Sequence, residues 1–187
     1  SEQLGPFLQA LLAPDAHPAL ASSKAVAVCM LDDLIEHCSP AAHALLPSAM
    51  PVIFAGLADP QDGVRQAAAY GVGVIAQHAS AHFMPKAAEA LQGLMAIINA
   101  PNAREPPADA ATDNAISAIG KMCEFCASDK AGAAGVGGGV DAAQLFPAWL
   151  AMLPIGADVT EAQAVHAQPA RRPEAGHPHP AGPAPTP

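Results

Sequence analysis

The stretch CMLDDLIEHC, residues 29–38, holds two cysteines, two aspartates, a glutamate and a histidine. Side chains of these types form metal sites, redox pairs and acid–base centres. Asp33 and His37 stand four positions apart, so a helix places them on one face, where both can bind one metal ion. The alternative is an ordinary helix with a solvated acidic stripe. We favour this alternative because no third ligand of matching geometry accompanies the pair.

The two cysteines of this stretch are not expected to form a disulfide. Cys29 and Cys38 are nine residues apart, which on a helix means about 13 Å along the axis and opposite sides. A disulfide needs Cα atoms within about 7 Å of each other. We therefore expect reduced thiols, as in the cytosol or the nucleus.

A second cysteine pair, Cys123 and Cys126, forms a lone CxxC motif. A zinc site needs a second such pair and a thioredoxin-like site follows a strand, and the sequence offers neither. We expect two small apolar thiols packed within a helix. The run GVGGGV, residues 135–140, is expected to be a connector, since no Lys-Ser or Lys-Thr follows it as in a phosphate-binding loop.

Residue arrangements typical of catalysis do not stand out. The sequence shows no Ser/His/Asp or Cys/His set, and no carboxylate pair in an apolar setting that would raise a pKa. We therefore predict no enzyme, no cofactor and no metal ion. The catalytic alternative, a helical-repeat lyase acting on a tetrapyrrole, would need an acid or nucleophile in a lined pocket.

Composition narrows both the fold class and the partners. Hydrophobic residues make up 51% of the chain and aromatic residues only 4%. Many of the hydrophobic residues are alanine. Many small side chains and few rings favour closely packed helices over a sheet. The net charge of −9, with only 8 Lys and Arg, argues against nucleic acid and suits basic partners. Because the chain shows neither a signal peptide nor a long uninterrupted apolar run, we expect neither secretion nor a membrane span.

Helical periodicity predicts helices over 24–38, 42–57, 62–78, 83–99, 109–125 and 144–153. In the first of these, the predicted apolar side carries Ala27, Met30, Leu31, Leu34, Ile35 and Cys38. The predicted polar side carries Asp32, Asp33, Glu36 and His37. Short breakers separate the helices, which indicates helical hairpins.

Three helix ends repeat along the chain: DDLIEHCS at 32–39, GVIAQHAS at 73–80 and GKMCEFCA at 120–127. Their spacings are 41 and 47 residues, counted between Asp32, Gly73 and Gly120. Such periods are typical of solenoids built from helix pairs. We predict an array over 1–167 with repeats at about 3–38, 42–79, 83–127 and an incomplete 142–167, followed by a disordered Pro/Ala-rich tail at 168–187.

The middle repeat carries a more specific signature in Pro51, Asp59, Val64 and Arg65. Pro51 is expected to bend the first helix of the pair, and Asp59 to cap the second helix together with Asp62 at the turn. Arg65 can then reach a neighbouring aspartate and start a ladder down the stack. This Pro, Asp, Val-Arg spacing is the consensus of HEAT repeats.

Four segments in order resemble successive HEAT repeats in the C-terminal third of the importin-beta superfamily. They are CMLDDLIEHCSP (29–40), VRQAAAYGVGVIAQ (64–77), ATDNAISAIGKM (111–122) and LFPAWLAMLPIGADVTEAQ (145–163). The resemblance implies an all-α HEAT-repeat α-solenoid of about three to four helix pairs. The chain departs from the family in its glycine-rich insertion at 131–140 and after Val165, and we expect it to be a piece of a longer receptor.

If the second helices of each pair line one side, their polar residues form a continuous strip that attracts basic segments. The strip is predicted to comprise Asp32, Asp33, Glu36, Asp62, Gln66, Tyr70, Gln77, Asp113 and Glu124. For Tyr70 the alternatives are a contact residue and an amphipathic ring at the surface. For Trp149 they are packing between repeats and a part in a Phe-binding pocket.

The resemblance implies a nuclear import receptor that moves between cytoplasm and nucleus through the nuclear pore. Its implied partners are basic cargo carrying nuclear localisation signals, Phe-Gly nucleoporins, and Ran with bound GTP. In that family the main Ran contacts lie in N-terminal repeats, which we expect to lie outside this chain. The alternative is a HEAT-repeat scaffold outside transport, which needs neither Phe pockets nor a response to Ran.

Overall fold

The computed structural model describes residues 21–126 and 141–171, and within these ranges the chain is helical and contains no strand. The helices, in chain order, are α2 (Ala21–Cys38), η2 (Ala41–Leu45), α3 (Leu46–Gly56), α4 (Asp62–His78), α5 (Ser80–Phe83), η3 (Met84–Lys86), α6 (Ala87–Ile98), α7 (Asp109–Phe125), α8 (Ala142–Leu150) and α9 (Val159–Arg171). None of the described helices is both long and apolar enough to cross a membrane.

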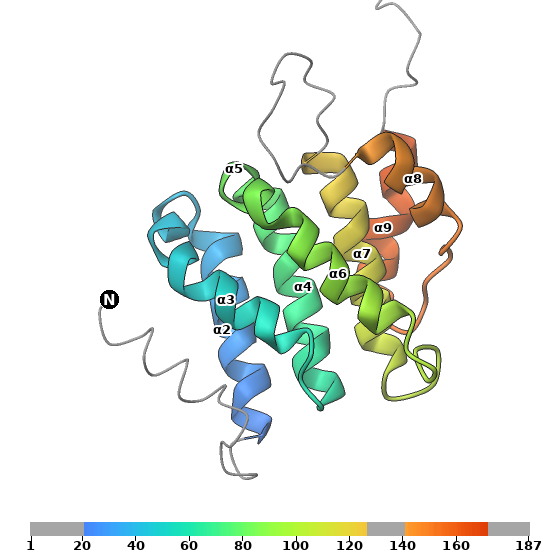
Figure 1. The fold of residues 1–187 in the computed structure, drawn as a ribbon, viewed down its shortest axis with the longest axis horizontal. Coiled ribbons are helices and arrows are strands. Elements are labelled where there is room, and N and C mark those ends of the chain that lie inside the picture. The colour runs from blue at the N-terminus through green and yellow to red at the C-terminus, as the bar shows by residue number, and fades with distance from the viewer. Residues whose placement is uncertain (1–20, 127–140, 172–187) are drawn as a thin grey trace, which may run out of the picture.

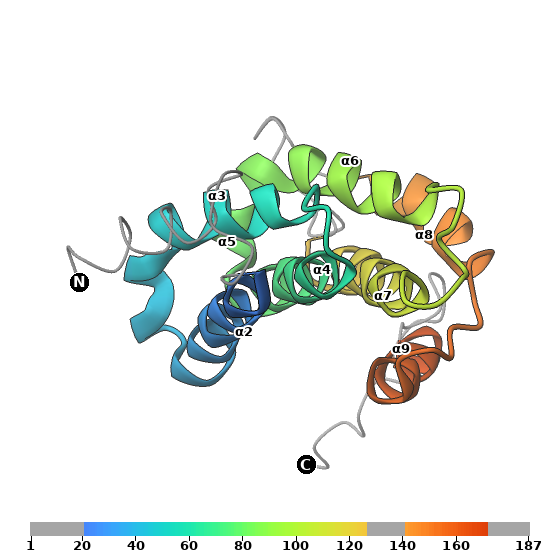
Figure 2. The same cartoon turned by 90° about the horizontal axis from the view of Figure 1, so that it is seen from below.

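The helices form two layers (Figures 1 and 2). In one layer α2, α4, α7 and α9 follow one another, with α4 packed between α2 and α7, and α7 packed against α9. Helices α3, α6 and α8 make up the other layer, and each packs on a helix of the first. The first layer is bowed, so its exposed side is concave, and we call it the inner layer (Figure 2). The predicted all-α solenoid is confirmed.

Alanine and glycine allow the inner helices to approach one another closely. Three alanines of α4 are buried because this helix packs between α2 and α7 and α3 packs on it. They are Ala67, Ala68 and Ala76. A Cβ atom added to Gly73 would lie only 3.3 Å from the Cα atom of Ala118 on α7. The alanine-rich composition is therefore the means by which the core packs helix backbone against helix backbone.

The predicted helix boundaries agree best in the inner layer. Helices α4 and α7 begin and end where the periodicity places them. The predicted helix 42–57 instead begins with the 3-10 turn η2, and 83–99 is divided into α5, η3 and α6. The predicted helix 144–153 ends early, at Leu150.

The predicted start of the tail at residue 168 is wrong. Helix α9 continues to Arg171, and periodicity did not predict this helix. The remainder of the tail and the glycine-rich run at 131–140 lie outside the described residues.

The predicted apolar side of α2 is right for Ala27, Leu31 and Ile35, which are buried, and wrong for Met30 and Cys38. Met30 is 61% exposed and Cys38 is exposed, whereas Asp32 is only 1% exposed. The side that faces α4 and α3 follows a regular three- and four-residue spacing and comprises Lys24, Ala27, Val28, Leu31, Asp32 and Ile35. This stripe contains Val28, Leu31 and Ile35. Burying their apolar area favours this orientation of α2, even though Asp32 is buried with them.

Candidate protein-binding surface

Polar side chains link the inner helices across the concave side. The Tyr70 hydroxyl on α4 donates a hydrogen bond of 2.7 Å to Glu36 on α2. The Lys121 ammonium on α7 lies 5.0 Å from the centre of the Tyr70 ring and 3.4 Å from the Glu161 carboxylate on α9. We call Glu36, Tyr70, Lys121 and Glu161 the inner ladder. It ties four consecutive helices of one layer together.

The ladder also sets the electrostatics of this surface. Burial, followed by the hydrogen bond to Glu36 and its negative charge, raises the pKa of Tyr70 well above its usual range, so the phenol stays a neutral donor. Glu161 is buried and accepts a further hydrogen bond from the Ser117 hydroxyl. The positive charge of Lys121 thus lies beside a buried carboxylate and is turned toward the protein.

Part of the predicted strip is available at the surface. Asp33, Gln77 and Glu124 are exposed, and Glu36 is half-buried. Glu36, Gln77 and Glu124 occupy equivalent positions on α2, α4 and α7 by the repeat spacing. These exposed positions carry negative or neutral side chains, so the inner layer has exposed carboxylates that would attract a basic segment.

Asp113 was predicted on this strip but is buried, being 1% exposed. Its Oδ2 accepts backbone N–H groups from Gly156, Ala157 and Asp158 at 2.8, 2.6 and 3.2 Å. Its Oδ1 accepts a hydrogen bond of 3.1 Å from Arg104. Asp113 therefore anchors the segment that leads into α9, and its place on the strip is wrong.

Asp32 and Asp62 also lie away from the exposed strip. Asp32 is buried between α2, α3 and α4. Asp62 is half-buried at the start of α4, where it bonds Arg65. For Asp32, the sequence rule that carboxylates face solvent gave the wrong side of the helix.

Gln66 takes part in a second cross-helix contact that the sequence did not predict. Its amide lies 3.4 Å from the carboxylate of Asp158, which also accepts a 3.0 Å hydrogen bond from Asn114 on α7. The other oxygen of Asp158 accepts the backbone N–H of Glu161 at 3.1 Å and caps α9. The sequence Asp-Val-Thr-Glu at 158–161 is a capping signal that would have located this helix.

Three of the four HEAT signature residues, Asp59, Val64 and Arg65, lie at the turn between α3 and α4 or at the start of α4. Val64 is fully buried, and Pro51 lies inside α3 with its side chain exposed. Arg65 reaches a neighbouring aspartate as predicted, since it bonds Asp62, and it also donates 2.8 Å to the carbonyl oxygen of Asp59. The Asp59 carboxylate accepts the Gln61 N–H at 2.9 Å.

Contact with the preceding repeat runs through a different pair. Lys24 on α2 lies 3.4 Å from the Asp59 carboxylate, and both side chains are at least nine-tenths buried. Arg65 stays within its own turn. The predicted ladder down the stack is therefore supplied here by a lysine.

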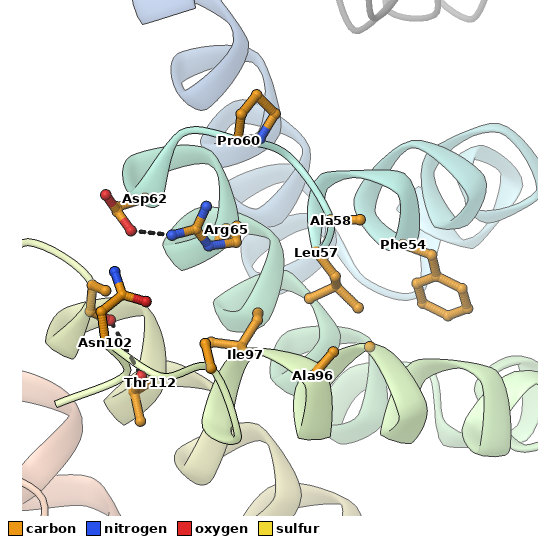
Figure 3. Close-up of a pocket in the computed structure, with 13 residues that line it drawn as sticks. Phe54, Leu57, Ala58, Pro60, Asp62, Arg65, Ala96, Ile97, Asn102 and Thr112 are labelled. Atoms are coloured by element: carbon orange, nitrogen blue, oxygen red, sulfur yellow. Dashed lines mark hydrogen bonds and ion pairs between the residues drawn. The ribbon is translucent and has the colours of Figure 1, made fainter.

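A cavity of about 490 Å³ lies between α3 and α6, on the side of the turns (Figure 3). Phe54, Leu57 and Ile97 form apolar walls, and Arg65 and Thr112 are among its polar residues. A Cβ atom added to Gly93 would collide with Leu57, so α6 and the end of α3 meet closely at the floor of the cavity. The site is thus an apolar recess with a polar rim between two neighbouring repeats.

The buried cysteines at the end of α7 and the tryptophan of α8 pack between helices. Cys123 and Cys126 are buried, and burial raises the pKa of Cys126 to about 12. Trp149 is fully buried and its ring N–H donates 2.9 Å to the carbonyl oxygen of Ile116, so it packs α8 on α7. Within the described ranges, no three His, Cys, Asp or Glu side chains come together as metal ligands would, Asp33 and His37 included.

Comparison with known proteins adds two findings. Residues 49–79, which span most of α3 and all of α4, match the HEAT repeat family. Over 99 residues the chain is 34% identical to the probable importin-5 homolog of Dictyostelium discoideum, an alignment that covers 51% of this chain and 9% of that relative. The chain thus spans a small part of the relative's length. It is a helical solenoid that contains a HEAT repeat and is similar, over half its length, to one part of an importin-like protein.

Proposed function

We propose that this chain is a segment of a nuclear transport receptor of importin-beta type, close to importin-5, and that it binds basic cargo on its inner layer. The partial similarity to an importin-5 homolog supports the class of protein. The exposed carboxylates on α2 and α7, two helices of the inner layer, support the role of this segment. The function is binding, not catalysis.

Cargo binding would rest on long-range attraction followed by many weak contacts. Asp33 and Glu124 stand free of the hydrogen bonds of the inner ladder and face solvent. A basic segment that lies along the concave side would meet these carboxylates in turn, and charge-assisted hydrogen bonds would hold it. Because the contacts are exposed, salt would weaken them.

The cavity between α3 and α6 is the candidate site for Phe-Gly repeats of nucleoporins. Its walls of Phe54, Leu57 and Ile97 offer apolar surface to a phenyl ring, and its volume exceeds that of one side chain. The full receptor would carry cargo from cytoplasm to nucleus through the nuclear pore. Release by Ran with bound GTP would use repeats outside this chain.

The test is binding of two labelled peptides to the full chain across a salt series: a basic nuclear localisation peptide and a Phe-Gly peptide. The proposal expects salt-sensitive binding of the first and saturable binding of the second. Asp33→Lys with Glu124→Lys should weaken the basic peptide about tenfold at low salt. Glu89→Lys, an exposed reversal on α6 in the other layer, is the matched control and should leave it unchanged.

The alternative is a HEAT-repeat scaffold that holds other proteins together outside transport. The same two peptides separate the proposals, because a scaffold has no need of a Phe pocket. If neither peptide binds a helical, monodisperse sample, transport contacts do not lie in this segment and the scaffold is favoured.

A further inference from the structure

Asp32 is a carboxylic acid buried in the contact between α2 and α4. Its side chain is 1% exposed, and neither oxygen finds a donor or acceptor anywhere in ranges 21–126 and 141–171. It points at the α4 backbone, where a methyl group on Gly71 would overlap its Oδ1 atom, and Ile53 of α3 lies beside the same spot. Asp32 therefore fills the space that Gly71 leaves open in the contact between α2 and α4.

The charges around Asp32 oppose its ionisation. The neighbours on its own helix that act on it are Asp33 and Glu36, both negative. Desolvation is the larger cause, and together these effects raise the pKa of Asp32 to about 8.

Among the described residues, the elements packed against α2 offer Asp32 no cation. Helix α3 has no ionisable side chain, and η2 has only His43, which bonds the carbonyl oxygen of His78. On α4, Arg65 is bonded to Asp62 and Tyr70 is bonded to Glu36. The one cation buried on α2, Lys24, lies at Asp59.

We propose that Asp32 makes the contact between α2 and α4 a proton-dependent latch. Helix α2 stays docked while Asp32 carries a proton, and loss of the proton favours release of α2 from the inner layer. Release would also separate Glu36 from Tyr70, so the latch controls one end of the inner ladder. This inference does not depend on the proposed transport function.

The sign follows from proton linkage. In the released state Asp32 is solvated and titrates near its ordinary value of about 4, whereas in the docked state it holds its proton to about pH 8. Between these values the released state binds fewer protons, so each unit of rising pH favours release about tenfold. Above the docked value both states are ionised and the effect levels off.

Amide hydrogen exchange of the full chain between pH 5 and 8, corrected for the intrinsic pH dependence of exchange, tests the latch. Amides of α2 should lose protection about tenfold per pH unit. Those of α7 should lose much less. Asp32→Asn keeps the side-chain shape but cannot ionise, so protection of α2 should become independent of pH. Asp33→Asn, an exposed change on the same helix, is the matched control: it should keep the steep loss of α2 protection with rising pH, levelling off at a lower pH because Asp32 then has one negative neighbour fewer.

A second measurement does not depend on any variant folding. The ¹³C signal of the Asp32 carboxyl group in the unchanged chain should titrate near pH 8. Titration near pH 4, or protection of α2 that keeps the same pH dependence in Asp32→Asn, overturns the proposal.

Discussion

Tyr70 and Glu36 join two successive inner helices through a single hydrogen bond of 2.7 Å. The bond has a charged acceptor and a donor held neutral by its surroundings, and such bonds contribute more than neutral ones. It is also the link through which α2 joins the rest of the inner ladder. Its loss should therefore be measurable in the stability of the array.

Tyr70→Phe removes the hydroxyl and keeps the ring beneath Lys121. We expect the free energy of unfolding to fall by about 1–2 kcal/mol, because half-buried Glu36 loses its donor. Urea unfolding followed by circular dichroism measures it. Gln77→Ala, an exposed change on the same helix, should have little effect. A Phe variant as stable as the unchanged chain would mean that water replaces the hydroxyl at no cost.

Asp113→Ala should destabilise the C-terminal part of the array by about 3 kcal/mol. The substitution removes the carboxylate that accepts hydrogen bonds from the Arg104 guanidinium and from three backbone N–H groups, those of Gly156, Ala157 and Asp158. These donors are then left without their acceptor. Hydrogen exchange should show the loss first in residues 156–165. Glu105→Ala, exposed in the preceding loop, is the control. Equal protection of that segment in both variants would contradict the anchoring role.

Ala96→Trp should fill the cavity between α3 and α6. Ala96 lines it but is exposed, so a large ring can enter the recess without displacing the core. If a Phe-Gly peptide binds there, this variant should lower its affinity at least about tenfold while leaving the basic peptide unaffected. Gln92→Trp places the same ring on an exposed position of α6 outside the cavity lining. A similar loss in both variants would place the peptide elsewhere.

The cysteines should divide into two classes when the folded chain is alkylated. Cys38 is exposed and should react first. Cys29 is exposed too, but partial burial and then the charges of Asp32 and Asp33 raise its pKa, so it should react more slowly. Cys123 and Cys126 should react only after unfolding. Mass spectrometry of timed samples gives the order, and early labelling of Cys126 would show that α7 opens locally.

The parts of the fold that could be predicted from sequence are those in which one local signal suffices. Helix α4 begins at Asp62 because that residue follows a turn of proline and aspartate, and its alanines continue without a breaker to His78. The burial of Val64 and the contact of Arg65 with an aspartate also follow from short-range spacing. Such features depend on neighbours a few residues away.

The candidate site was harder to predict because its contacts join distant residues. Asp32 and Asp113 are polar by type, yet both are buried, one against a glycine 39 positions along and one beneath backbone donors more than 40 positions along. Lys121 and Glu161 meet only because α7 and α9 lie side by side. A rule that places charged side chains in solvent cannot foresee partners brought by packing.

The close approach of Gly73 to Ala118 has a consequence for the geometry of a longer array. At this junction a methyl group added to Gly73 would lie 2.9 Å from Cδ of Lys121 and 3.3 Å from the Cα atom of Ala118, so the Lys121 side chain and the α7 backbone would have to shift. In a quasi-one-dimensional stack, each repeat inherits the orientation of the one before it. A small change in the angle between two repeats at one glycine would therefore displace every repeat that follows. It would alter the pitch and the length of the whole superhelix.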